Sequence, residues 1–125
     1  MERNMAEANN ARRTGPALEA MYQFMLWLVP TVDKFPRARK FTLGDRIETT
    51  ALDVMDGLIA ATYTRGRDAL LVQANLGLER LRFLFRLAME LRCIDTKRYE
   101  HAARSLDEIG RLVGGWMKAH RAQDA

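Results

Sequence analysis

Apolar residues recur every three or four positions along most of this chain, and that spacing is typical of one face of an α-helix. No stretch alternates apolar and polar residues with β-branched enrichment, so we predict no strand. Three short breaks interrupt the pattern, at residues 33–42, 64–66 and 93–96. Short connections of this kind join antiparallel neighbours, so the pattern predicts an all-α, up-down antiparallel four-helix bundle.

The periodicity also fixes where the helices should begin and end. It predicts four helices, over residues 16–32, 43–64, 68–92 and 96–120. Pro16 suits a first helical turn, where its missing N–H needs no partner. We expect Thr42 and Asp95 to cap the second and fourth helices. The predicted organisation is a polar N-terminal tail over 1–15, the bundle over 16–120 and a C-terminal tail over 121–125.

Two of the helices carry more large apolar side chains than one core stripe uses. The second and third helices each have a further apolar stripe well away from the core face. A bulky edge of the core would explain this surplus, but we favour an interface between subunits. In the first helix, Tyr22 and Val29 are assigned to the core, while Trp27 should point away from it and fill an interface or stack on a base. The predicted interface residues are Trp27, Leu52, Ile59, Leu76, Phe83 and Leu87.

Composition fits one folded domain without disulfides. Of the 125 residues, 48% are hydrophobic, which is enough for a core, and Cys93 is the only cysteine. The polar start of the chain has no apolar segment of the kind a secretion signal needs. No apolar run approaches the roughly 18 residues of a membrane span. We therefore expect a protein of the reducing cytoplasm.

The net charge of +4 is distributed in segments along the chain. Basic residues dominate residues 33–46 and 65–92, whereas residues 47–64 carry only carboxylates. Arginine forks and lysine charges bind phosphates, so clusters of them are candidate contacts to nucleic acid. A plainer interpretation is that these side chains solvate the surface or pair with acidic neighbours, as Glu79 and Glu90 could do at helical spacing. The predicted nucleic-acid-binding residues are Arg37, Arg39, Lys40, Arg82 and Arg86.

Residues for catalysis are sparse. The two histidines, His101 and His120, are about five helical turns apart, too far to share a metal. Neither Cys93 nor the single serine, Ser105, has the neighbours that would activate a nucleophile. No glycine-rich loop matches a nucleotide-binding fingerprint. We predict no catalytic residue, no metal and no cofactor.

Two motifs suggest a family. The run Lys34-Phe35-Pro36-Arg37, followed by Phe41-Thr42-Leu43-Gly44-Asp45-Arg46-Ile47, resembles the opening of the four-helix-bundle proteins encoded in 23S ribosomal RNA intervening sequences. The runs Glu108-Ile109-Gly110-Arg111 and Gly114-Gly115-Trp116 resemble the matching C-terminal motif. The family includes Avd, the accessory variability determinant of diversity-generating retroelements. The resemblance covers residues 17–120, nearly the whole predicted domain.

The resemblance implies a homopentamer of four-helix bundles. Avd-type members bind the reverse transcriptase of the retroelement, and nucleic acid through a positively charged surface, and perform no chemistry themselves. Asp53 and Asp56 on the second helix make this chain less basic than the resemblance leads one to expect.

Two functions therefore stay open. The first is an oligomeric accessory protein that binds RNA or DNA and a reverse transcriptase. The second is a structural or protein-interaction module of the intervening-sequence type, without affinity for nucleic acid. A reverse transcriptase gene beside this one would favour the first, and a salt-dependent binding titration would separate the two.

Overall fold

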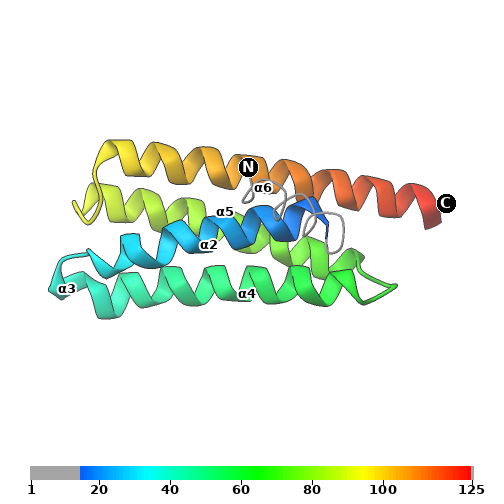
Figure 1. Cartoon of the computed structure of the whole chain (residues 1–125), viewed down its shortest axis with the longest axis horizontal. Coiled ribbons are helices and arrows are strands. Elements are labelled where there is room, and N and C mark those ends of the chain that lie inside the picture. Colours follow the sequence, from blue (N-terminus) through cyan, green and yellow to red (C-terminus); the bar gives the residue numbers. More distant parts are fainter. Residues whose placement is uncertain (1–14, 125) are drawn as a thin grey trace, which may run out of the picture.

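A computed structural model describes residues 15–124 of the chain (Figure 1). Within this range four long helices are joined by short connections, and there is no strand. A short helical turn and a π-helical turn lead into the second long helix. The predicted all-α four-helix bundle is confirmed. The elements are α2 (Pro16–Asp33), α3 (Arg37–Arg39), η1 (Lys40–Gly44), α4 (Asp45–Thr62), α5 (Asp68–Glu90) and α6 (Thr96–Asp124).

The long helices run alternately up and down around one core. Helix α4 packs on α5, α5 on α6, α6 on α2, and α2 on α4. The connections α2–α4 and α5–α6 therefore lie at one end of the bundle, and the α4–α5 connection lies at the other (Figure 1). Residues far apart in sequence are thus gathered at each end.

Most residues of the predicted core stripes are buried in the interior. Each long helix contributes fully buried side chains at three- and four-residue spacing, the arrangement that lets one face meet the other helices. Phe35, from the first connection, is also buried and closes that end of the core. The largest fully buried side chains include Met21, Leu28, Ile47, Leu58, Leu71, Leu78, Leu81, Phe85, Leu106 and Ile109.

The core face of α2 is rotated from the predicted one. Tyr22 and Val29 are exposed, so their assignment to the core is wrong, whereas Phe24 is buried. Phe24 packs near Phe85 of α5, with ring centroids 5.9 Å apart. The reason is that α2 contacts both α4 and α6, and the contact with α6 turns the buried face toward Phe24.

The first connection is shorter and more helical than predicted. The chain is helical again from Arg37, and a π-turn passes directly into α4. Thr42 does not cap a helix, because it already lies inside one, and its hydroxyl donates to the carbonyl of Arg39 at 3.3 Å. Gly44 lets this turn sit close to α2, since a Cβ there would lie 2.8 Å from Val32 Cγ1.

Helix α6 begins where predicted and ends later. Asp95 caps it by accepting a hydrogen bond from the backbone N–H of Arg98 at 2.8 Å, as predicted. The helix continues to Asp124, so most of the predicted C-terminal tail is helical. The predicted N-terminal tail lies outside the described residues, apart from Gly15. Among the described helices, none is long and apolar enough to cross a membrane.

Candidate functional site

Basic side chains gather at the end of the bundle where the α2–α4 and α5–α6 connections meet. Four of them lie between α2 and α4, one lies in the connection between α5 and α6, and one lies in the first turn of α6. Within residues 15–124 none of these six side chains forms a salt bridge, although Lys40 is close enough to Glu48 to lower the pKa of that carboxyl. We call this surface the basic end, and its residues are Lys34, Arg37, Arg39, Lys40, Arg92 and Lys97.

Three of the predicted nucleic-acid-binding residues lie at this basic end. Arg37 and Arg39 are exposed and held on a helical turn, and the ammonium of Lys40 lies 5.7 Å from the centre of the Phe41 ring. Arg39 is close enough to the second connection to lower the pKa of the Cys93 thiol, although burial raises that pKa by more. The two connections lie at the same end of the bundle (Figure 1).

The other two predicted residues are engaged within the bundle. Arg82 donates to Glu79 at 2.8 Å and to the carbonyl of Leu106 at 3.3 Å, and it pairs with Asp107 at 3.4 Å. It thereby ties α5 to α6. Arg86 pairs with Glu90 at 3.4 Å on its own helix. The structure brings neither of them to the basic end.

Trp27 lies between helices and does not point away from the bundle, so that expectation is wrong. Its ring centroid lies 4.6 Å from that of His101 on α6 and 5.6 Å from that of Phe24 on α2. The ring is partly buried because α6 covers the side of α2 opposite the predicted core stripe. Its role at an interface between copies stays a prediction.

The other predicted interface residues are exposed on the surface of the bundle. Leu52 and Ile59 on α4 are 43% and 40% exposed. On α5, Leu76, Phe83 and Leu87 are 44%, 60% and 45% exposed. Their role at an interface between copies stays a prediction.

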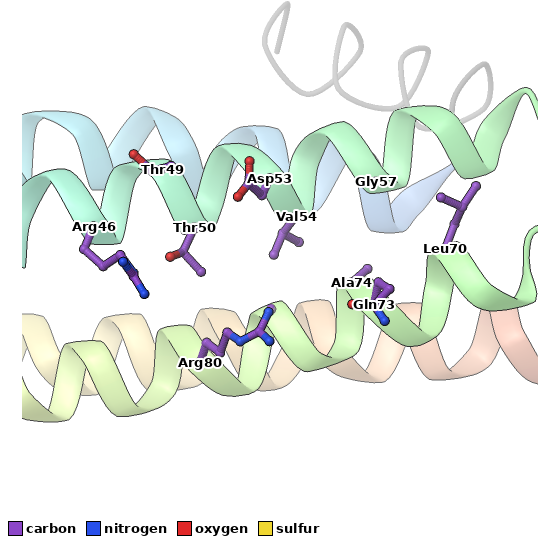
Figure 2. Close-up of a pocket in the computed structure, with 11 residues that line it drawn as sticks. Arg46, Thr49, Thr50, Asp53, Val54, Gly57, Leu70, Gln73, Ala74 and Arg80 are labelled. Atoms are coloured by element: carbon purple, nitrogen blue, oxygen red, sulfur yellow. The ribbon is translucent and has the colours of Figure 1, made fainter.

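A groove between α4 and α5 was not predicted. It has a volume of about 500 Å³, and its narrow floor includes Gly57 and Gly77. Figure 2 shows Arg46 from α4 and Arg80 from α5 extending into the space between the two helices. Neither arginine forms a salt bridge within the described residues. The carboxylate of Asp53 on α4 also lines the groove, so the lining carries two positive charges and one negative charge.

This groove continues into a second hollow of about 360 Å³. Arg46, Thr50 and Arg80 line both, so the two form one depression along α4 and α5. The second hollow adds the apolar side chains of Leu76 and Phe83. The charged groups of Arg46 and Arg80 therefore lie beside the predicted interface residues of α5.

The described residues add no catalytic hypothesis. No group of three or more histidine, cysteine or acidic side chains among them could hold a metal ion. His101 Nε2 and Ser105 Oγ are 3.5 Å apart on the exposed side of α6, at the outer limit of a hydrogen bond.

Comparison with known proteins gives one match. No curated protein and no solved structure matches the chain. A family model described as bAvd-like matches residues 17–120, which is the whole of the described bundle apart from its two ends. The family resemblance inferred from the motifs is therefore confirmed, and the chain belongs to the bAvd-like family.

Proposed function

We propose that this protein is a non-enzymatic accessory protein that assembles with copies of itself, binds nucleic acid at its basic end and engages a reverse transcriptase. Membership of the bAvd-like family supports the accessory role. The reverse transcriptase and the homopentamer follow from the family resemblance. The observation that carries the nucleic-acid contact is the basic end itself.

The basic end has the properties of a phosphate-binding surface. Its arginines and lysines are not neutralised by salt bridges within the described residues, so a phosphate would not have to displace a carboxylate. Arg37 and Arg39 lie on a helical turn that the buried Phe35 anchors to the core. The backbone that carries these two charged side chains is therefore held in place by the core.

One bundle offers few charges, so tight binding requires repetition. Assembly places several copies of the basic end around one axis, and weak contacts then add through multivalency. Each neutralised phosphate contributes about 0.7–0.9 to the slope of log affinity against log salt. The assembled protein is expected to show a steep salt dependence.

The test replaces Arg37, Arg39 and Lys40 together with alanine. We expect binding to single-stranded RNA and DNA oligonucleotides to weaken uniformly across sequences, and the salt slope to flatten. Fluorescence anisotropy at several salt concentrations measures both. The matched control removes the same charge elsewhere, by alanine at Arg65, Arg104 and Lys118, which are exposed and form no salt bridge within the described residues.

The outcomes separate the two functions. If the Arg37 triple variant loses affinity and the control variant retains it, the basic end is the binding surface. If the parent protein itself binds neither RNA nor DNA at low salt, the alternative holds: a structural or protein-interaction module without nucleic-acid affinity. Affinity purification from native cells then decides whether a reverse transcriptase is the protein partner.

A further inference from the structure

The same arrangement of side chains occurs on two helices with opposite charge. On the outer side of α5, Leu76, Arg80 and Phe83 follow the spacing i, i+4, i+7. At 100° per residue these three side chains lie within roughly 60° of one another. All three are exposed. The result is a stripe with a cation between two large apolar groups, which we call the basic stripe.

On α4, Leu52, Asp56 and Ile59 repeat this spacing with a carboxylate in the middle. They too lie within roughly 60° of one another and are exposed. We call this row the acidic stripe. Within the described residues neither Asp56 nor Arg80 forms a salt bridge. Each stripe thus has an apolar pair and an unneutralised charge at the same relative position.

The two stripes face different directions on one bundle. The groove of Figure 2 marks the α5-facing side of α4, where Thr50 lies. Leu52 is 43% exposed and roughly 160° away from Thr50 around the helix, so the acidic stripe points away from α5. One bundle can therefore present both stripes to two neighbours at the same time.

We infer that the acidic stripe of one copy packs on the basic stripe of a second copy, with Asp56 paired to Arg80 across the contact. Leu52 and Ile59 then cover Leu76 and Phe83, which removes apolar surface from water on both partners. Arg46 lines the same hollow as Arg80 and adds positive charge there, whereas the one carboxylate in that hollow, Glu79, is already paired with Arg82. The charges favour this pairing over a contact of either stripe with itself.

This contact joins unlike surfaces, so it is heterologous. A heterologous contact builds a ring when its rotation closes and an open filament when it does not, whereas self-pairing of one stripe gives a two-fold dimer. The inference rests on the self-assembly in the proposed function, and it names the two surfaces that meet when two copies assemble.

The deciding experiment reverses the two charges, alone and together. We expect Asp56→Arg and Arg80→Asp each to raise the dissociation constant of the assembly at least about tenfold, because each places like charges in contact. The double variant Asp56→Arg/Arg80→Asp restores an opposite pair in every contact and should return to near the parent value. Sedimentation velocity measures all four proteins. The control reversals Glu100→Arg and Arg104→Asp, on the exposed side of α6, should leave assembly unchanged.

A mixing experiment tests the direction of the contact. Leu52→Asp blocks the acidic stripe and Phe83→Asp blocks the basic stripe, so each variant alone should be monomeric. In an equimolar mixture, the intact basic stripe of Leu52→Asp can still bind the intact acidic stripe of Phe83→Asp. Native mass spectrometry should therefore show one-to-one dimers. Circular dichroism checks that both exposed-site variants keep the helical bundle.

The outcomes distinguish this pairing from self-assembly in general. A parent protein that is monomeric at high micromolar concentration overturns both. If the parent assembles but the double charge reversal stays as weak as the single ones, this pairing is wrong and assembly uses another surface. If Leu52→Asp assembles like the parent, assembly does not use the acidic stripe and the head-to-tail contact is wrong.

Discussion

Gly77 on α5 lies directly against Val54 on α4, and a methyl group at Gly77 would clash with the Cγ2 atom of Val54. The two helices approach closely here because Gly77 has no side chain. We therefore expect Gly77→Ala to lower the free energy of unfolding by about 1–3 kcal/mol through overpacking. Alanine gains ~1 kcal/mol over glycine in a helix, so the net loss is smaller where Val54 can shift and larger where it cannot.

Urea denaturation measures the effect, and Gly114→Ala is the matched control. Gly114 also lies inside a helix, but a Cβ there would meet nothing within 4 Å. We expect Gly114→Ala to raise the free energy of unfolding by about 0.5–1 kcal/mol. Equal stability of the Gly77 variant and the parent would show that α4 and α5 can move apart without cost.

Arg82 should contribute to stability and not to nucleic-acid binding. Its guanidinium joins α5 to the Leu106 carbonyl and to Asp107 on α6. We expect Arg82→Ala to lower the free energy of unfolding by about 1–2 kcal/mol, because hydrogen bonds from a charged donor are lost. Arg86→Ala, which removes only an exposed pair with Glu90, should change it by less than about 1 kcal/mol. Oligonucleotide affinity of Arg82→Ala should match that of the parent; a loss as large as that of the Arg37 triple variant would contradict this assignment.

Asp68 should titrate below the usual range of an aspartate. Arg121 donates to both of its oxygens, at 2.7 and 3.2 Å, and this hydrogen bonding lowers the pKa of Asp68 from its ordinary value of 3.8. The pair therefore stabilises the end of α6 fully above pH 3.8, and this contribution is lost as the pH falls through the lowered pKa. NMR titration of the Asp68 carboxyl carbon should show its pKa rising toward 3.8 in Arg121→Gln. An unchanged pKa in that variant would mean that the contact does not persist in solution.

Glu48 should behave in the opposite way. Burial, then the charges of Asp33 and Asp45, raise the pKa of Glu48 above its ordinary value of 4.5. The stabilisation from protonating this group is complete below pH 4.5 and is lost as the pH rises through the raised pKa. Glu48→Gln should therefore be more stable than the parent at neutral pH, with a gap that narrows toward pH 4. Thermal unfolding at a series of pH values checks this, and a pH-independent gap would count against it.

The sequence predicts the helices well because their buried apolar residues recur every three or four positions. In α4, α5 and α6, residues such as Val54, Phe85 and Ile109 occupy the stripe expected from helical spacing and are buried. The exposure of Leu52, Leu76 and Phe83 was also predicted, since a helix in a bundle buries only part of its circumference. The spacing of apolar residues within one helix predicts its buried face even when the positions of the neighbouring helices are unknown.

What the sequence did not predict depends on those neighbours. Phe24 and Tyr22 are both large and apolar, and only the position of α6 decides that Phe24 is the buried one. Arg82 has a helical partner in Glu79 that spacing could predict, but its contact with Leu106 requires the register of α5 on α6. Arg46 lies near the start of α4 and Arg80 lies in α5, so the two are far apart in the sequence. They line one groove because α4 packs against α5.

The π-turn at Lys40–Gly44 has a consequence for the energetics of binding at the basic end. A loop carrying Arg37, Arg39 and Lys40 would have to be ordered when a ligand arrives, at a cost of about 1–2 kcal/mol for each backbone position fixed. Here the backbone is already helical from Arg37 to the start of α4, so the ordering takes place during folding. Less of the favourable free energy of the contact between these side chains and a phosphate is then offset by the cost of ordering the backbone.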